Sequence, residues 1–158
     1  MEEKKVTKVA LISDTHGLLR ESVKEKLRDA DLILHAGDVG DISVIEELRK
    51  FAHVVAVAGN MDYMGPASCL PQTECVEVAG KQIYILHDLF LLDISPEESS
   101  TDIVVHGHTH KPDEFERNGV MYINPGSAGP RRYSYPISMA YLMISEEKVT
   151  AEFITLDS

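Results

Sequence analysis

The stretch "KVALISDTHG", residues Lys8–Gly17, joins a short run of β-prone apolar residues to a polar turn. An apolar run of this length, stopped by a glycine-containing turn, is typical of a buried strand. The same arrangement recurs in "ADLILHAGD" (residues 30–38) and in "HVVAVAGN" (residues 53–60). The sequence therefore predicts three buried strands, each followed directly by polar side chains.

Two amphipathic segments separate these strands. In residues 19–28 and residues 41–51, apolar side chains recur at helical spacing with charged residues between them. The second segment begins at Asp41 or Ser43, either of which can cap a helix. The apolar faces consist of Leu19, Val23 and Leu27 in the first segment and Val44, Ile45 and Leu48 in the second. The first half thus reads β-α-β-α-β, an order that predicts parallel strands covered by helices.

The second half of the chain reads as strands joined by tight turns. Residues 74–88 form a predicted hairpin around 79–81, and residues 113–127 form another around the turn signal Asn118–Gly119. Residues 101–110 add a strand and turn, and residues 138–156 add two strands joined at 146–148. We therefore expect one α/β domain over residues 1–158, with two packed mixed sheets and flanking helices.

Composition narrows the classes of function. The chain has 158 residues, 44% hydrophobic and 26% charged, with a formal net charge of -11. This charge argues against a non-specific nucleic-acid or anionic-membrane binder, although bound metal ions could still attract an anionic substrate. Two cysteines do not make a disulfide framework, and the first apolar run is too short for a signal peptide or membrane span. We expect a cytoplasmic protein.

Polar residues at the carboxyl ends of the predicted strands suggest one site, because ligand crevices of α/β sheets form there. Each one alone has an ordinary explanation as a turn former, helix cap or chance histidine. Burying so many charged and polar side chains together without partners is costly in free energy, and a bound metal ion would offset that cost. Imidazole and carboxylate without thiolate suit Mn, Fe, Zn, Ni or Co. Seven ligands suit two ions about 3.5–4 Å apart that share a carboxylate, as in phosphoester hydrolysis. These residues are Asp14, His16, Asp38, Asn60, His87, His108 and His110.

The chain resembles the calcineurin-like metallophosphoesterase superfamily in the order of five motifs. They are Asp14-x-His16, Gly37-Asp38, Gly59-Asn60-x-Asp62, His87 and Gly107-His108-x-His110, and they span nearly the whole chain. The small size, "GNMD" and the later "NPGS" resemble the compact YfcE/MJ0936-type phosphodiesterase branch.

The resemblance implies a four-layer αββα sandwich with a dinuclear site. One metal would take Asp14, His16, Asp38 and His110, and the other Asp38, Asn60, His87 and His108. Asp38 would bridge the ions, and a hydroxide between them would attack phosphorus in line with the leaving oxygen.

The sequence departs from this family in two places. Met61 stands where larger relatives have a histidine that assists the leaving group, so protonation must come from water or another group. Asp88 stands where glycine is frequent, and the short segment 88–102 is expected to form part of the pocket wall. The expected catalytic residues are Asn60, Asp62 and His108, with Asp62 orienting Asn60 or a nearby histidine.

The remaining polar residues carry two interpretations each. We expect His35 to have a structural or supporting role rather than to be a ligand, and His106 to lie beside the ligands or in solvent. Asn124 and Ser127 either shape a turn near the metals or, with Asn60, contact substrate. Arg131 and Arg132 either bind phosphate or lie in a solvated loop.

We therefore hypothesise that the chain is a phosphodiesterase that acts on small organic phosphodiesters. Its two divalent metal ions are expected to be manganese, with Ni, Fe, Zn, Co or Mg as alternatives. The alternatives at the same site are phosphomonoesterase or nuclease activity. A non-catalytic scaffold resembling the retromer subunit of this superfamily is a further alternative. No stable nucleic-acid partner and no membrane are expected, and homodimers or tetramers are expected from compact relatives.

Overall fold

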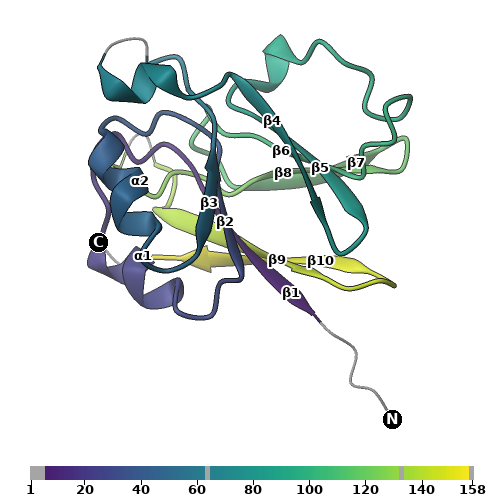
Figure 1. The fold of residues 1–158 in the computed structure, drawn as a ribbon, viewed down its shortest axis with the longest axis horizontal. Coiled ribbons are helices and arrows are strands. Elements are labelled where there is room, and N and C mark those ends of the chain that lie inside the picture. The colour runs from purple at the N-terminus through teal and green to yellow at the C-terminus, as the bar shows by residue number, and fades with distance from the viewer. Residues whose placement is uncertain (1–5, 63–64, 132–133, 157–158) are drawn as a thin grey trace.

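The computed structural model describes residues 6–62, 65–131 and 134–156, whose strands form two five-stranded sheets (Figure 1). The first sheet has the order β10-β9-β1-β2-β3, and the second has the order β4-β5-β6-β8-β7. The first comprises β1 Thr7–Ile12, β2 Leu32–His35, β3 His53–Ala56, β9 Ser138–Ile144 and β10 Val149–Thr155. The second comprises β4 Thr73–Val78, β5 Lys81–Leu86, β6 Ile103–Val105, β7 Asp113–Arg117 and β8 Val120–Asn124.

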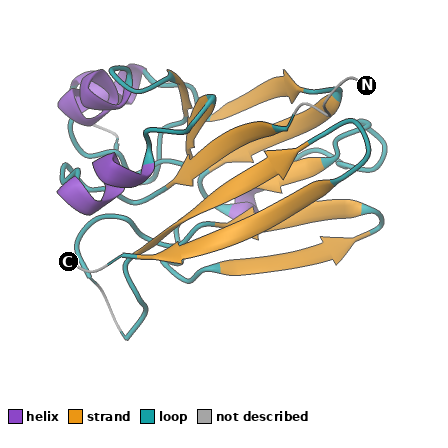
Figure 2. Ribbon diagram, turned by 90° about the horizontal axis from the view of Figure 1, so that it is seen from below, coloured by secondary structure: helices purple, strands orange, loops and turns teal. Residues whose placement is uncertain are grey.

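The two sheets pack face to face through a shared apolar core, and Figure 2 shows the strands as two stacked layers. Alternation along β1 explains this packing, since successive side chains of a strand point to opposite faces. Val9 and Leu11 pack between the sheets, whereas Ala10 and Ile12 pack on the outer side. All four are fully buried.

Helices α1 (Glu21–Lys26) and α2 (Ile42–Leu48) contribute to the outer core of the first sheet. Their predicted apolar residues are buried, except for Leu19, which is partly buried, and Asp41 caps α2 by accepting from the Ser43 amide. Both helices are shorter than predicted. On the other outer face, the segment around the 3₁₀ helix η2 (Leu89–Leu91) packs on the second sheet. The predicted four-layer arrangement is confirmed, with a thin fourth layer.

Three parallel strands in each sheet position the site. Strands β1, β2 and β3 run parallel in the first sheet, as do β5, β6 and β8 in the second. The hairpin predicted at Asn118–Gly119 joins β7 to β8, and both turn residues have positive φ, of 53° and 79°. No helix in the described part of the chain is long and apolar enough to cross a membrane.

Candidate metal centre

The loops that follow five strands bring all seven predicted ligands to one edge of the sandwich. Five of these residues have left-handed backbone, with φ from 47° to 74°. They are Asp14, His16, Asp38, His108 and His110. Such backbone costs about 1–2 kcal/mol per non-glycine residue, and strain of this kind gathers at functional sites. The loops therefore hold these side chains in place at a cost in stability.

Asp14 lies at the centre of the cluster and is fully buried. Its Oδ2 accepts hydrogen bonds from Ser13 Oγ at 2.8 Å and from the His108 amide at 3.1 Å. Its Oδ1 has no hydrogen-bond partner among the described residues. This oxygen nevertheless lies 3.4 Å from His110 Nε2, 3.8 Å from His87 Nε2 and 3.9 Å from His16 Nε2.

Asp38 lies between the two predicted metal sites. Its Oδ2 is 3.8 Å from His16 Nε2 on one side and 3.3 Å from His87 Nε2 on the other. Its Oδ1 accepts from the Met61 amide at 2.8 Å, so the carboxylate is fixed in orientation. Asp38 Oδ2 therefore lies near one imidazole from each of the two predicted ligand sets.

Asn60 Oδ1 lies between the imidazoles of His87 and His108. It lies 2.9 Å from His87 Nε2 and 3.1 Å from His108 Nδ1. The segment that carries His108 and His110 is a bent loop in which both residues have left-handed backbone. As a result the two imidazoles face different partners, His108 facing Asn60 and His110 facing Asp14.

The donor atoms fit divalent metal ions. His87 Nδ1 lies 2.8 Å from the Ala36 carbonyl, to which it donates, so the neutral imidazole has its lone pair on Nε2. That lone pair faces the oxygens of Asn60, Asp38 and Asp14, and lone pairs brought together repel unless a cation lies between them. His16 Nε2 is likewise buried without a hydrogen-bond partner among the described residues. Two groups of suitable ligand atoms result, Asp14–His16–His110 and Asp14–Asp38–His87.

The electrostatics of the cluster favour bound positive charge. Burial raises the pKa of the Asp14 carboxyl, and His87 and Ser13 only partly offset this. Burial also raises the pKa of Asp38, but the hydrogen bond and charge of His87 outweigh it and leave that pKa below its ordinary value. Burial lowers the pKa of His87, yet Asp38 and Asp14 outweigh burial and leave it raised. The carboxylates thus favour a cation beside them, whether proton or metal.

Two glycines allow the loops to approach the ligands. A Cβ on Gly107 would lie 2.0 Å from Ser13 Oγ and 3.0 Å from Asp14 Oδ2. A Cβ on Gly59 would lie 2.1 Å from Asp38 Oδ1. Contacts this short do not occur at real Cβ atoms, so the cluster requires glycine at both places.

Asp62 is buried and binds backbone rather than a ligand side chain. Its carboxylate accepts from the amides of Val39, Gly40 and Gly59, at 2.9–3.0 Å. These bonds tie together the loops that carry Asp38 and Asn60. The expectation that Asp62 orients Asn60 or a histidine directly is corrected to this role through the backbone.

His35 is fully buried and links the first two loops. The Gly37 amide donates to its Nδ1, so Nε2 carries the proton and donates to Thr15 Oγ1 at 3.0 Å. Thr15 Oγ1 in turn donates to the Val39 carbonyl. Burial lowers the pKa of His35 to about 4, so its imidazole is neutral at pH 7. His106 is also buried, and burial lowers its pKa to about 4.

The residues predicted to contact substrate are used mostly within the protein. Asn124 donates to the Gly107 carbonyl and to Thr109 Oγ1, and its Oδ1 accepts from the Gly126 amide. Ser127 Oγ donates to the Asp14 carbonyl. Both are buried and shape the loops around the ligands, the other interpretation given to them. Arg131 is exposed, and Arg132 lies outside the described residues.

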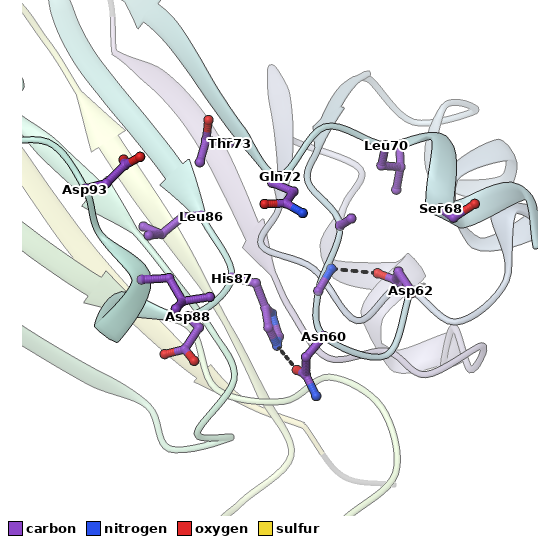
Figure 3. A pocket seen from close by; sticks show the side chains of 13 residues that line it. Asn60, Asp62, Ser68, Leu70, Gln72, Thr73, Leu86, His87, Asp88 and Asp93 are labelled. Carbon is purple, nitrogen blue, oxygen red and sulfur yellow. Dashed lines mark hydrogen bonds between the residues drawn. The ribbon is translucent and has the colours of Figure 1, made fainter. Parts of the chain in front are cut away.

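Sequence reasoning missed Ser13 and Thr15, which bond the Asp14 carboxylate and His35. Both lie inside or beside the first motif, but small hydroxyl residues there give no pattern of their own. Sequence reasoning did place part of the pocket wall in segment 88–102. A cavity of about 430 Å³ borders Asn60 and His87, and its wall includes Asp88, Leu91 and Asp93 from that segment. Figure 3 shows Asp88 and Asp93 beside His87 and Asn60.

The calcineurin-like phosphoesterase superfamily domain matches residues 7–147. Since this match spans most of the chain and agrees with the fold and the ligand cluster, the chain belongs to the calcineurin-like metallophosphoesterase superfamily. Membership of this family implies hydrolysis of phosphoesters with the help of divalent metal ions.

Individual relatives agree with this placement. A probable metallophosphoesterase of Methanocaldococcus jannaschii is 32% identical over 162 residues, covering 94% of this chain and 81% of the relative. Phosphodiesterase MJ0936 of the same organism is 27% identical over 137 residues, covering 75% of this chain and 82% of that protein. Vacuolar protein sorting 29 of Cryptosporidium parvum has a TM-score of 0.76 at 22% identity, over 94% of this chain and 97% of that one. The last likeness concerns the fold alone.

Proposed function

We propose that the chain is a metal-dependent phosphodiesterase that hydrolyses small organic phosphodiesters at this cluster. The observation that carries the proposal is Asp14 Oδ1. It is buried without a hydrogen-bond partner among the described residues, and three imidazole nitrogens lie within 3.9 Å of it. Burying an unsatisfied carboxylate oxygen is costly, and a bound cation removes that cost.

Asp14, His16, Asp38 and His110 would hold one divalent ion, and Asp38, Asn60, His87 and His108 the other. Manganese is our first choice of metal, with Ni, Fe, Zn, Co and Mg as alternatives. Bound there, such ions would supply an activated water and neutralise charge on phosphoryl oxygens. The chain's own part is to fix the ligands: Ala36 holds the His87 ring, and Ser13 holds the Asp14 carboxylate.

Asn60 and His108 lie at the exposed side of the cluster, where a substrate phosphoryl group can reach them. Met61 follows Asn60, is 51% exposed and has no proton to donate. The leaving alcohol must therefore take its proton from water or another group, or leave as an anion. We expect esters with good leaving groups, such as nitrophenolate, to react fastest.

Two alternatives are weaker on the same observations. Nuclease activity needs a basic track for the phosphate backbone, whereas the cavity beside the ligands is lined by carboxylates. A scaffold function has some support in Phe90 and Leu91, which are 95% and 73% exposed. A scaffold would not need the buried, strained ligand set described above. Cytoplasmic location and assembly into dimers or tetramers stay predictions.

The test is hydrolysis of bis(p-nitrophenyl) phosphate by protein stripped of metal and then supplied with Mn²⁺, Ni²⁺, Fe²⁺, Zn²⁺, Co²⁺ or Mg²⁺ in turn. We expect activity to return with at least one ion, and to exceed the activity on the monoester p-nitrophenyl phosphate. Folded protein that stays inactive with every ion would refute the proposal. A higher rate on the monoester would replace the diesterase assignment by a monoesterase one.

A further inference from the structure

The cavity of about 430 Å³ beside the ligands is large enough for the organic group of a substrate. Its wall includes Asn60 and His87, so a group bound there is contiguous with a phosphoryl group at the metal centre. The other walls come from the segment after β3 and from the end of β5 with η2, as Figure 3 shows.

The charges on this wall are all negative. Its charged members are Asp62, Asp88 and Asp93, and among the described residues that line it none is Lys or Arg. Asp62 is already bonded to three backbone amides, which leaves Asp88 and Asp93 as the carboxylates that a ligand would meet. Figure 3 shows both on the β5–η2 side of the cavity.

The two carboxylates differ in surroundings. Asp88 is held in place, since Oδ1 accepts from the Phe90 amide and Oδ2 lies 3.8 Å from His108 Nε2. Asp93 is exposed to solvent on the cavity wall. Elsewhere on the wall, Leu70, Leu86 and Leu91 supply apolar surface. The lining therefore combines negative charge with methyl groups.

We propose that this cavity binds an alcohol group of the phosphodiester and selects one that carries an ammonium or quaternary ammonium group. The inference rests on the proposed function, because the phosphoryl group must lie at the metal centre. A cation near Asp88 and Asp93 is attracted, whereas a second phosphate or carboxylate on the substrate is repelled. The leucines accommodate the alkyl groups that surround an ammonium nitrogen.

The kinetic test compares two esters of the same shape. p-Nitrophenylphosphocholine carries a quaternary ammonium, and p-nitrophenyl 3,3-dimethylbutyl phosphate has a carbon in place of that nitrogen. Water attacks phosphorus in both and the bond to nitrophenolate breaks, which leaves phosphocholine or 3,3-dimethylbutyl phosphate. We expect kcat/KM to favour the ester that carries the ammonium group by about tenfold at low salt, and less as salt rises.

Asp93→Asn should reduce this preference to about threefold or less, with little change in kcat/KM for the dimethylbutyl ester. The matched control is Asp29→Asn, which removes the same charge from an exposed residue at the amino end of β2, the end opposite the metal centre. It should leave the preference intact. Equal kcat/KM for the two esters, or a preference that survives Asp93→Asn, would overturn the proposal.

A binding measurement separates this inference from the proposed function. Methyl resonances of Leu70, Leu86 and Leu91 are followed by NMR while choline, and separately 3,3-dimethylbutanol, is added to protein without metal. We expect larger shifts with choline, reduced in Asp93→Asn. If neither ester is hydrolysed but choline shifts these methyls, the proposed reaction fails and the cation site stands. If choline produces no shift, or dimethylbutanol an equal one, the cation site fails whatever the hydrolysis result.

Discussion

Replacing Gly107 by alanine should damage both stability and metal binding. The added Cβ would lie 2.0 Å from Ser13 Oγ and 3.0 Å from Asp14 Oδ2. Since Cβ contacts below 3.0 Å essentially never occur, the serine hydroxyl must move by about 1 Å or more. That movement breaks the 2.8 Å hydrogen bond from Ser13 to the Asp14 carboxylate.

Overpacking of this kind costs about 1–3 kcal/mol, and a hydrogen bond to a charged group contributes about 1.5–3 kcal/mol. Because the two effects overlap, we expect a loss of about 3 kcal/mol in the free energy of unfolding. With a slope of about 2 kcal/mol per molar urea, the unfolding midpoint falls by about 1.5 M. Metal affinity should fall by about 10-fold or more, because Asp14 loses its orienting partner.

Urea unfolding and calorimetric Mn²⁺ titration measure the two effects. In a Ser13→Ala background the hydroxyl is absent, so Gly107→Ala should cost at least about 1 kcal/mol less than in the wild type. Gly119→Ala is the control, because its Cβ meets nothing within 4 Å and only backbone strain results. It should leave metal affinity unchanged. An equal cost of Gly107→Ala in both backgrounds would refute the role given to Ser13.

Three further predictions concern the groups around the ligands. Burial lowers the pKa of His35 from 6.5 to about 4, so the folded protein resists protonation of this imidazole. The neutral imidazole therefore contributes about 3 kcal/mol to the free energy of unfolding above pH 6.5, and this contribution is lost as the pH falls toward 4. An NMR titration that gives His35 a pKa near 6.5 would contradict this. Asp62→Ala leaves three backbone amides without their acceptor and should lower the free energy of unfolding, measured with urea, by about 3 kcal/mol. A decrease of less than about 1 kcal/mol would contradict the role given to Asp62. Asp88→Asn removes the carboxylate that faces His108 and should weaken Mn²⁺ binding about tenfold by calorimetry; unchanged affinity would show that Asp88 does not support His108.

Much of the fold could be predicted because local signals agreed with the tertiary arrangement. Apolar runs ending at glycine turns identified β1, β2 and β3, and Asn118–Gly119 identified the hairpin of β7 and β8. The ligand positions were predictable for the same reason, since polar residues directly after parallel strands converge on one edge. Local pattern did not reveal that β5, β6 and β8 also run parallel, because strand order depends on packing between distant segments.

The details of the site were harder to predict for a physical reason. Asn124, Ser127 and Asp62 all carry groups suited to substrate or metal, but the structure uses them to bond loop backbone. Which use a polar group finds is decided by loops that meet only in the folded chain. The left-handed backbone of His108 and His110 could not be predicted either, because positive φ is uncommon in every residue type but glycine, even in histidine, which is enriched there. The resemblance implied a fourth layer, but local pattern did not show which segment forms it, because its helix η2 is a single short turn.

If the cluster around Asp14 and Asp38 holds two divalent ions, metal analysis of the purified chain will detect them. Elemental analysis after loading with Mn²⁺ and removal of free ion should find close to two ions per chain. Asp38 lies between His16 and His87, so Asp38→Asn should lower the occupancy of both sites and abolish phosphodiester hydrolysis. A folded wild type that retains no ion, or an Asp38→Asn variant that keeps both ions and full activity, would contradict the account.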